Sequence, residues 1–353
     1  MKRKFLAMAL CATMVLGLAA CGAKEEPKEE TTGKEDSAKE EAGEEAGDIT
    51  IGISIDQLFD SRVATVMGLE KAGEAAGVAM KESVAKGDAQ VQANQISQFI
   101  KDGVQGLLIC PVDLNTIETS LIEAKAAGIP VVLYDRDAPD STNVLTAVTC
   151  GATDDGYQGG KYIADQLAAQ NKDKYVIAEL RGPANDDIGV QRSAGFNKAI
   201  TEVLGDKAEV VVVETGAWDT PTATANFQAS LTANPEICAV FCGTDSFFPG
   251  VETVLTEASK QVNVGEEGHV IVTGINGSKE GYDAVINKIA DGTVVMDCPN
   301  TGVAAMEALL ANIKDGTTPE RTIFVPSAFY TGEDIEANKD GIWGVMDLGL
   351  KYQ

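Results

Sequence analysis

From residue 49 onward, short apolar runs alternate with longer stretches in which apolar residues recur at steps of three and four positions. The apolar runs are continuous, which is typical of β-strands covered on both faces. We expect strands at 49–55, 106–110, 131–134, 175–180, 209–214, 239–242 and 270–275. The periodic stretches predict helices at 62–76, 93–101, 116–127, 160–170, 192–203, 222–233 and 251–260, with C-terminal caps at Gly77, Gly103, Gly128 and Gly205.

The repeated order of strand, helix and strand predicts an α/β fold with doubly wound parallel sheets. Two parts of the chain are similar to each other. Residues 104–136 and 237–277 both read as a strand, an Asp-containing loop, a helix, a second strand and a polar tip. A length of 353 residues also favours about two domains over one. We therefore expect two lobes, each built on its own sheet.

Polar residues gather directly after the predicted strands, where the loops of such sheets bind ligands. At any single position an Asp is equally well interpreted as a helix cap or a turn residue, so the prediction depends on the set. Carboxylates, amides, guanidinium groups and an aromatic face together are suited to a polyhydroxylated ring. The set comprises Asp56, Asp60, Asp113, Asp135, Arg136, Asn185, Asp186, Trp218, Asp219, Thr244, Asp245 and Asn276.

The amino-terminal residues predict export. Lys2, Arg3 and Lys4 precede a short apolar stretch at 5–18, which is typical of a signal peptide at 1–20. The sequence LAAC ending at Cys21 resembles the lipobox of bacterial lipoproteins, in which the cysteine is lipidated; the alternative is an ordinary secretory signal with an incidental cysteine. Residues 22–48 lack Leu, Ile, Val and aromatic residues, which predicts a disordered acidic tether. We expect an extracytoplasmic protein, lipid-anchored to the bacterial cell membrane.

The composition argues against several other classes of protein. A net charge of −26 and a pI near 4.3 disfavour nucleic acid or an anionic membrane surface as a partner. The remaining cysteines lie mostly in or at the end of apolar runs and are interpreted as core residues, not as disulfide or zinc ligands: Cys110, Cys150, Cys238, Cys242 and Cys298.

Recognisable catalytic motifs are absent from the sequence. The single histidine, His269, is interpreted as structural, and no nucleophile elbow, phosphate-binding loop or calcium-binding loop is present. We therefore predict binding rather than catalysis, with no metal and no cofactor.

Several motifs resemble the bacterial solute-binding proteins of the ribose-binding and galactose/glucose-binding type. They are GLLICPVD, AAGIPVVLYDR, DDGYQGG, TGAWDT, AVFCGTDS, GINGS and DGTVVMDCP, and the similarity extends from about Ile49 to the end of the chain. The resemblance implies two α/β lobes joined by a three-stranded hinge, the type I periplasmic binding protein arrangement, with crossings near Asp154, Asp297 and Val325. It implies an N-terminal lobe of 49–153 plus 299–325 and a C-terminal lobe of 154–298 plus 326–353.

The same resemblance implies a set of sugar-binding residues. In the first lobe they are Asp60 with Asp56 beside it, and Asp135 with Arg136. In the second lobe they are Arg192, the stacking aromatic Trp218, Thr244, Asp245, Asn276 and Asp297. One of Asn185, Asp186 and Asp187 completes the set, and Asp186 is our choice among them. Asp137 has no matching role and is interpreted as a turn residue before Pro139.

The sequence also departs from the pattern of these proteins. Arg62 and Val63 stand where relatives place an aromatic residue, with Phe59 as the nearest substitute; Thr244 replaces Asn, and Asp and Asn are exchanged between 276 and 297. The ligand is therefore left open among a common monosaccharide, a polyol, a deoxy sugar, an amino sugar and a furanose. A cationic ligand stays open if Arg136 and Arg192 serve to neutralise neighbouring acids.

We predict a monomeric lipoprotein that binds a pentose or hexose between its lobes and delivers it to the permease of an ABC importer. One alternative is a sugar-sensing protein that signals to a membrane receptor. A less favoured alternative is an exported sugar-acting enzyme.

Overall fold

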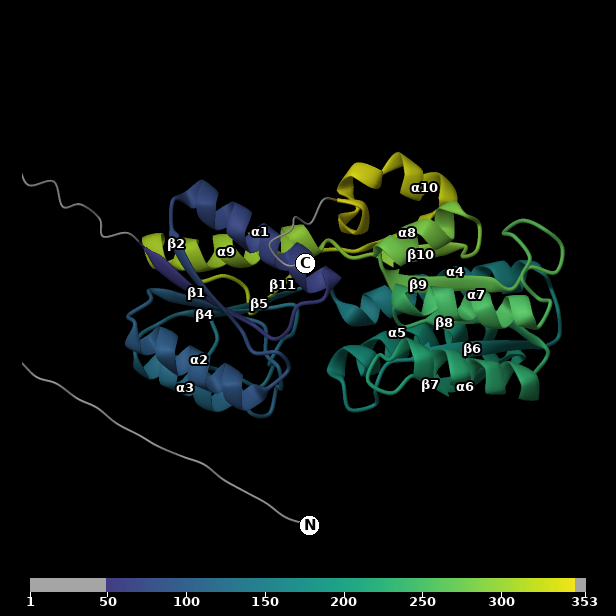
Figure 1. The fold of residues 1–353 in the computed structure, drawn as a ribbon, viewed down its shortest axis with the longest axis horizontal. Helices are drawn as coiled ribbons and strands as arrows, with labels where there is room; N and C mark the ends of the chain where they lie inside the picture. The colour runs from purple at the N-terminus through teal and green to yellow at the C-terminus, as the bar shows by residue number, and fades with distance from the viewer. Residues whose placement is uncertain (1–48, 347–353) are drawn as a thin grey trace, which may run out of the picture. The chain divides into compact units, whose positions relative to one another are not determined.

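The computed structural model describes residues 49–346. The predictions of a signal peptide, a lipidated Cys21 and a tether concern residues 1–48 and lie outside the described residues. The described chain forms two six-stranded sheets flanked by helices (Figure 1), so the predicted α/β class with two doubly wound sheets is confirmed.

The first sheet has the strand order β2-β1-β3-β4-β5-β11, and all its neighbouring strands are parallel. Its strands are β1 (Thr50–Ile55), β2 (Ala79–Val84), β3 (Gly106–Ile109), β4 (Val131–Tyr134), β5 (Thr146–Thr149) and β11 (Thr322–Phe324). Helices α1 (Asp60–Ala76) and α9 (Cys298–Asp315) cover one face, and α2 (Ala89–Lys101) and α3 (Glu118–Ala126) cover the other (Figure 1).

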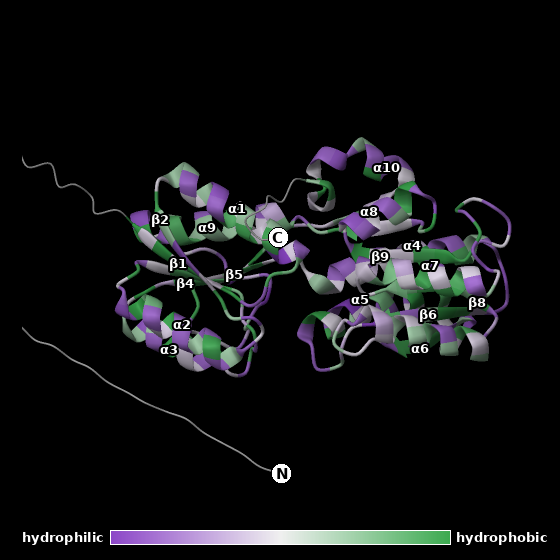
Figure 2. Ribbon diagram, in the orientation of Figure 1, coloured by the Kyte–Doolittle hydropathy of each residue, from purple (hydrophilic) through white to green (hydrophobic). Residues whose placement is uncertain are grey.

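Burial on both faces explains the continuous apolar runs of the central strands. Leu108 and Val132 belong to the core beneath α1 and α9, whereas their neighbours Leu107 and Val131 belong to the core beneath α2 and α3. Successive side chains of a strand point to opposite faces, so every position in these strands needs an apolar residue. Figure 2 shows the strands as apolar and the outer helix surfaces as largely hydrophilic.

The second sheet has the order β7-β6-β8-β9-β10-β12. Its strands are β6 (Tyr175–Arg181), β7 (Ala208–Glu214), β8 (Ile237–Cys242), β9 (Ile271–Asn276), β10 (Gly292–Val295) and β12 (Ala328–Thr331). Helices α4 (Ala152–Ala169) and α5 (Asp187–Leu204) pack on one face, and α6 (Thr220–Ala233), α7 (Phe248–Glu257) and α8 (Lys279–Ile286) on the other. Short helices complete the chain: α10 (Gly332–Ala337) and the 3₁₀ turns η1 (Gly205–Lys207), η2 (Asp245–Phe247), η3 (Lys339–Gly341) and η4 (Trp343–Val345).

The second sheet is parallel except at one edge, where β12 runs antiparallel to β10. The chain reaches β12 directly from β11 through residues 325–327, without a helix between them.

The chain passes between the two sheets three times. It leaves the first sheet after β5, returns after β10 to form α9 and β11, and leaves again to form β12. Asp137 fixes the returning strand, since its carboxylate accepts hydrogen bonds from Arg321 Nη1 at 2.9 Å and Thr322 Oγ1 at 3.0 Å. Asp137 was predicted to be a turn residue. Its carboxylate also holds β11, the edge strand of the first sheet, in position.

Each of the first two passages leads into a helix that touches another helix through glycine. A Cβ on Gly156 of α4 would overlap the backbone of Arg192 in α5, and one on Gly195 would overlap the backbone of Thr153. In the first lobe, a Cβ on Gly302 of α9 would overlap the backbone of Thr65 in α1. These contacts explain why α4 begins at Ala152, well before the predicted 160: its glycines serve helix packing and do not break the helix.

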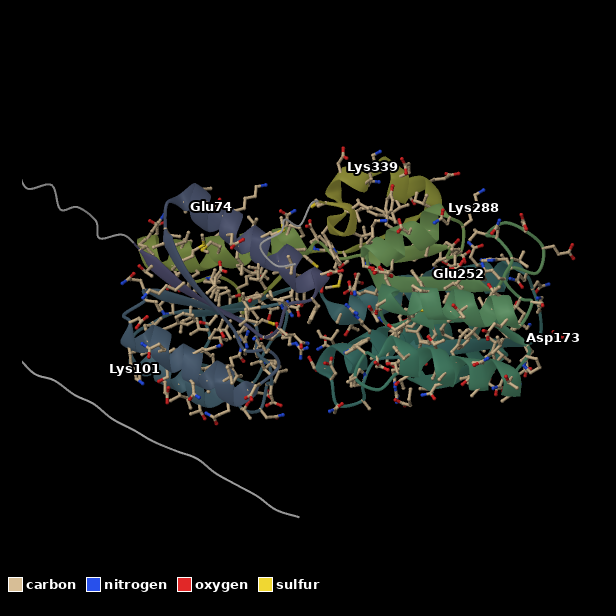
Figure 3. The ribbon with its side chains drawn as sticks, in the orientation of Figure 1. Glu74, Lys101, Asp173, Glu252, Lys288 and Lys339 are labelled. Carbon is tan, nitrogen blue, oxygen red and sulfur yellow. The ribbon has the colours of Figure 1, made fainter. Side chains whose placement is uncertain are left out.

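Most charged residues of the described chain lie at the surface, including Glu74 and Lys101, which are labelled in Figure 3. The cysteines of the described chain are all free, and four of the five are buried. No helix between residues 49 and 346 is long and apolar enough to cross a membrane.

Candidate functional site

A cleft of about 1230 Å³ lies where the loops after the strands of both sheets converge. Its lining includes Phe59, which is 41% exposed, and Asp113. Nine of the eleven predicted binding residues contribute to the lining: Asp56, Asp60, Asp135, Arg136, Asp186, Arg192, Trp218, Thr244 and Asn276. The other two, Asp245 and Asp297, lie elsewhere.

Asp245 is completely buried and does not line the cleft. Its carboxylate accepts hydrogen bonds from the backbone N–H of Gly277 at 2.8 Å and Ser278 at 3.1 Å, and from Thr293 Oγ1 at 2.7 Å. Burial raises the pKa of Asp245 to about 6 despite these three donors. The structure therefore corrects the predicted ligand role: Asp245 ties together the loops that follow β8 and β9.

Asp297 is the N-cap of α9, and its side chain accepts hydrogen bonds from the backbone N–H of Asn300 at 3.2 Å and from Asn300 Nδ2 at 2.7 Å. It borders a separate, smaller cavity of about 350 Å³. Its predicted place in the sugar site is therefore not supported, because the carboxylate is turned toward its own helix.

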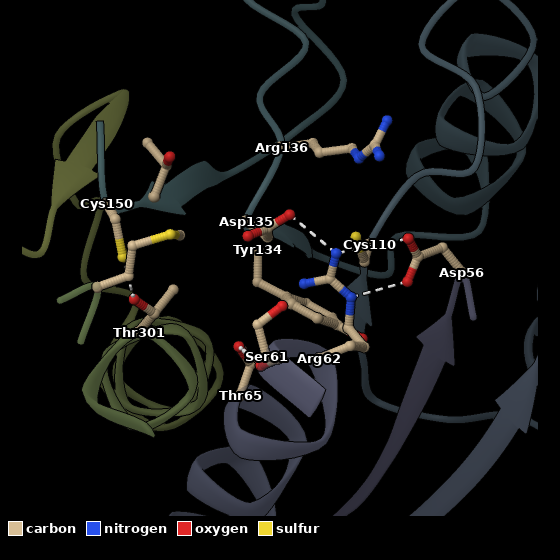
Figure 4. Close-up of polar contacts among 12 residues, drawn as sticks. Asp56, Ser61, Arg62, Thr65, Cys110, Tyr134, Asp135, Arg136, Cys150 and Thr301 are labelled. Atoms are coloured by element: carbon tan, nitrogen blue, oxygen red, sulfur yellow. Dashed lines mark hydrogen bonds and ion pairs between the residues drawn. The ribbon is translucent and has the colours of Figure 1, made fainter. Parts of the chain in front are cut away.

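Arg62 joins two of the predicted acids beneath the first-lobe side of the cleft (Figure 4). Its Nε donates to Asp56 Oδ1 at 2.7 Å, and its Nη2 donates to Asp135 Oδ2 at 2.8 Å. The guanidinium carbon lies 5.3 Å from the ring centroid of Phe59 and 5.6 Å from that of Tyr134. The position where relatives place an aromatic residue thus holds a cation between two rings and two carboxylates.

Arg62 and Asp135 stabilise each other's charged forms. Burial alone would lower the pKa of Arg62, but Asp135 and Asp56 raise it well above its ordinary value. Burial alone would raise the pKa of Asp135, but the charge and hydrogen bond of Arg62 lower it below its ordinary value. Each group therefore holds the other in its charged form. Asp135 also has a left-handed backbone, with φ at 68°, directly after β4.

Arg136 and Asp186 form a contact across the cleft. Arg136 Nη2 lies 3.5 Å from Asp186 Oδ2, and Asp186 is at the same time the N-cap of α5. Asn185 and Asp187 line the cleft as well, so the loop before α5 offers all three predicted side chains to it.

Arg192 is the central donor on the second-lobe side. Its Nη1 donates to the carbonyl of Gly243 at 2.7 Å, and its Nη2 donates to Asn276 Oδ1 at 3.0 Å. Asn276 Nδ2 donates in turn to Thr244 Oγ1 at 3.0 Å. The three predicted residues Arg192, Asn276 and Thr244 therefore form one hydrogen-bonded chain.

Trp218 lies beside this chain, with the guanidinium carbon of Arg192 5.8 Å from its ring centroid. The indole ring has no room to move toward the sheet, because a Cβ on Gly182 would overlap it. It is half-buried and lines the cleft. An aromatic face held in this way can cover the apolar face of a sugar ring.

Two residues of the site were missing from the set predicted from sequence. Arg62, which is buried beneath the cleft lining, was noted only as a departure from relatives, although an arginine six residues after Asp56 can reach that carboxylate. Asp155 belongs to the DDGYQGG motif and lines the cleft, but the sequence offered no reason to prefer it to the adjacent Asp154.

His269 lies away from the cleft lining. Its Nδ1 is 2.6 Å from the carbonyl oxygen of Val262, and its Nε2 is 2.8 Å from Asp291 Oδ2. The predicted structural role accords with these contacts. Among the described residues, no group of three or more His, Cys, Asp or Glu side chains is arranged to hold a metal ion.

Known proteins resemble this chain along most of its length. The family profile described as "Periplasmic binding protein domain" matches residues 56–318. The ribose import binding protein RbsB of Bacillus subtilis (strain 168) is 27% identical over 280 residues, which cover 79% of this chain and 86% of that protein. The galactofuranose-binding protein YtfQ of Escherichia coli (strain K12) is 27% identical over 304 residues, 83% of this chain and 92% of that one.

The solved structures include close matches to the fold. The crystal structure of a galactofuranose-binding protein superposes with a TM-score of 0.71 at 25% sequence identity. The superposition covers 83% of this chain and 99% of that one.

Proposed function

Because the chain belongs to the periplasmic binding protein family, we propose that it binds one monosaccharide, a pentose or a hexose, in the cleft and delivers it to the permease of an ABC importer. Its relatives are named as binding proteins, and the chain is a binding protein rather than an enzyme.

The observation that carries the proposal is the chemistry of the second-lobe side of the cleft. Arg192, Asn276 and Thr244 form a fixed series of donors and acceptors, and the ring of Trp218 stands next to it. Hydroxyl groups need both donors and acceptors, and the carbon face of a sugar ring needs an apolar surface. A site that offers both within one cleft is suited to a monosaccharide.

Ion pairs occupy three of the carboxylates of the site. Arg62 offsets Asp56 and Asp135, and Arg136 lies against Asp186. Five further acidic residues line the cleft and form no ion pair with a described residue: Asp60, Asp113, Asp155, Asp187 and Glu280. The charge of the cleft therefore leaves a cationic ligand open beside a neutral one. The sugars named for the relatives, ribose and galactofuranose, are neutral.

The volume of the cleft supports capture by closure. At about 1230 Å³ it exceeds the range of roughly 300–1,000 Å³ that is usual for small-molecule pockets. A single sugar ring would leave most of this space to water. We propose that the first lobe, 49–153 plus 299–325, and the second, 154–298 plus 326–353, approach each other around the sugar.

We also propose that the mature protein is a lipoprotein held outside the cell membrane by Cys21. The support is the sequence: a basic amino terminus, a short apolar stretch, LAAC and a polar tract. Replacement of Cys21 by Ser should move the protein from the membrane fraction to the soluble fraction of a bacterial host. A protein that stays in the membrane fraction would contradict the anchor.

The test of sugar binding is a thermal-shift panel with residues 22–353 and D-ribose, L-arabinose, D-galactose, D-glucose, myo-inositol and xylitol. A ligand at a thousand times its dissociation constant stabilises the native state by about 4 kcal/mol, which is a shift of several degrees. Failure of every sugar in the panel would count against the proposal.

Trp218→Ala should remove most of the affinity for the sugar that the panel identifies. The reason is that stacking on an aromatic ring is lost, while Arg192 and Asn276 keep their mutual hydrogen bond. Isothermal titration calorimetry measures the effect, and Tyr282→Phe is the comparison, because Tyr282 lies outside the cleft lining and its hydroxyl donates to Glu336 at 3.0 Å.

A further inference from the structure

One buried carboxylate of the cleft is left without a partner. Asp155, the fourth residue of α4, is completely buried, yet it contributes to the cleft lining. Neither of its carboxylate oxygens accepts a hydrogen bond from any residue between 49 and 346. Its neighbour Asp154 is different, since its Oδ2 accepts a hydrogen bond from Gln158 at 2.8 Å.

A buried donor near Asp155 is also unsatisfied. The Nε of Arg192 has no acceptor in the described part of the chain, and one of the two contacts of its Nη2 is the thioether sulfur of Met296 at 3.0 Å. Sulfur of this kind is a weak acceptor. Arg192 forms no ion pair with any described carboxylate, although its charge acts on Asp155.

The backbone keeps these two residues together. Gly156, directly after Asp155, is in contact with the backbone of Arg192, and α4 cannot slide along α5 without a clash. Asp155 and Arg192 therefore present an acceptor and a donor at a fixed position. Thr149, Gly151 and Met296, at the ends of the first two passages between the sheets, line the same part of the cleft. We call this part the hinge end of the cleft.

An unpartnered polar group in a protein interior is costly. Leaving one buried donor or acceptor unsatisfied destabilises a protein by about 1–3 kcal/mol, and native structures contain few such groups. Here a donor and a carboxylate are both unsatisfied at one end of a ligand-binding cleft. A bound group that both donates and accepts would satisfy the two at once, and a hydroxyl is the simplest such group.

We propose that Asp155 is a ligand-binding residue that, together with Arg192, holds one hydroxyl group of the sugar at the hinge end of the cleft. This inference rests on the proposed function. The hydroxyl donates its hydrogen to a carboxylate oxygen of Asp155 and accepts the N–H of Arg192 Nε. The site thereby selects a neutral sugar or polyol with a hydroxyl at that position, and disfavours the corresponding deoxy compound and a sugar acid.

Binding should then be linked to proton release. Burial raises the pKa of Asp155 to about 7. The charge of Arg192 and the hydroxyl of Ser327, which makes no full hydrogen bond, both lower this pKa. The charges of Asp154 and Asp135 raise it. Cys150, whose own pKa burial raises to about 12, is uncharged. A ligand hydroxyl that donates to the carboxylate favours its ionised form and lowers the pKa. Sugar affinity should therefore rise with pH between about 6 and 8.

The experiment is calorimetry of residues 22–353 with whichever of D-ribose, L-arabinose, D-galactose, D-glucose, myo-inositol and xylitol binds, at pH 7 in phosphate and in Tris. The two buffers differ in ionisation enthalpy, so a difference in the observed binding enthalpy counts the protons released. For the unmodified chain we expect release of a fraction of one proton, and a higher affinity at pH 8 than at pH 6.

Asp155→Asn should weaken binding by about 10- to 100-fold and abolish the buffer difference, because the amide does not titrate. Asp154→Asn is the matched control: it removes a carboxylate one position away and should leave the affinity at pH 8 unchanged. Because the charge of Asp154 raises the pKa of Asp155, the buffer difference should become smaller in this variant but persist. The unmodified chain tests the inference even if Asp155→Asn fails to fold, since a flat affinity between pH 6 and 8 with no buffer difference would overturn it.

The outcomes separate this inference from the function on which it rests. Sugar binding by the unmodified chain with full affinity in Asp155→Asn would overturn the role of Asp155 and leave the sugar-binding function intact. The absence of binding by any of the six compounds would overturn the proposed function, and the inference with it.

Discussion

At the scale of single residues, Arg62 is the side chain on which the first-lobe side of the cleft depends. Replacement by Met keeps its length but leaves Asp56 and Asp135 buried without a counter-charge. Removal of one partner from a buried ion pair costs about 3–5 kcal/mol, so we expect Arg62→Met to lower the free energy of unfolding at pH 7 by that amount. Denaturant titration followed by circular dichroism measures it.

Acid provides an internal control for the Arg62 prediction. Arg62 lowers the pKa of Asp135, so the stability that it confers is present at neutral pH and is lost as the pH falls through that lowered value. The difference between the native chain and Arg62→Met should therefore shrink below pH 4. An undiminished difference in acid would mean that lost packing, rather than lost charge, causes the effect.

For Asp245 we predict the opposite dependence of stability on pH. Its pKa in the folded state is about 6, above the ordinary value of 3.8, so the folded state holds a proton that the unfolded state has released. Stability should fall as the pH rises from 4 to 6, by about 2 kcal/mol of the roughly 3 kcal/mol that a shift of this size is worth in full. Asp245→Asn should lack this dependence. Thermal unfolding of both proteins at pH 4, 5 and 6 tests it, and parallel curves would contradict it.

Much of the candidate site could be predicted from the sequence, because polar residues after parallel strands meet at one edge of the sheet. This rule led to Asp60, Trp218 and Asn276, which line the cleft. It failed for Asp245 and Asp297, because an Asp after a strand also accepts hydrogen bonds from loop and helix N–H groups. No local pattern indicates which use the fold makes of it.

Arg62 was missed for another physical reason. One of its partners, Asp135, is 73 residues away in the sequence, and their pairing exists only once β1 and β4 are placed in one sheet. Asp155 was missed because the feature that distinguishes it from Asp154 is burial, which depends on the neighbouring α5.

At the scale of elements, glycine sets the separation of α4 and α5. Gly156→Ala would place a methyl group against the backbone of Arg192, and overpacking of this kind costs about 1–3 kcal/mol or more, because a backbone cannot rotate out of the way. Thermal unfolding should show a lower midpoint. Gly341→Ala is the matched control, since no atom lies within 4 Å of its added Cβ, and it should be neutral. A neutral Gly156→Ala would contradict the close contact.

Seven of the twelve strands of the described chain and most of its helices followed from the sequence pattern, but β2, β5, β10, β11 and β12 did not. β2 and β11 are edge strands without a fully buried residue, and β5 has a threonine at each end. Such segments lack the continuous apolar run that marks a strand covered on both faces. Helix α9 was also missed, although its buried Ala305, Met306 and Leu309 recur at helical steps.

At the scale of the whole molecule, the first lobe depends on residues that follow the second in the sequence. Met306, Leu309 and Leu310 of α9 are buried in its core. Each such side chain contributes about 1.5–3 kcal/mol, and a whole domain has only about 5–15 kcal/mol of stability. Replacement of Leu309 by Asp should therefore weaken the protection of β1, β3 and β4 against amide hydrogen exchange, while β6, β8 and β9 keep theirs.

The corresponding control is a change on the exposed side of the same helix. Lys314→Ser, at an exposed position of α9, should leave exchange in both sheets unchanged. Protection of β1 in Leu309→Asp equal to that in the native chain would show that the first lobe does not depend on α9.

The internal similarity of the sequence was enough to predict two lobes, because each unit repeats the same order of elements. It could not predict which lobe receives the last strands. That depends on α9, which returns to the first sheet, and on β12, which pairs with β10 in the second.

The glycine contacts between α4 and α5 and between α1 and α9 restrict the kind of motion that this molecule can make. Packed helices shear by small sliding movements that their side chains absorb, and helices in backbone contact have no side chains to absorb them. A rotation of one sheet relative to the other must therefore occur at the residues that connect them, 150–151, 296–297 and 325–327. Because such a motion changes few backbone torsions, ligand binding costs little conformational entropy. Most of the free energy of the protein–ligand contacts therefore contributes to the affinity.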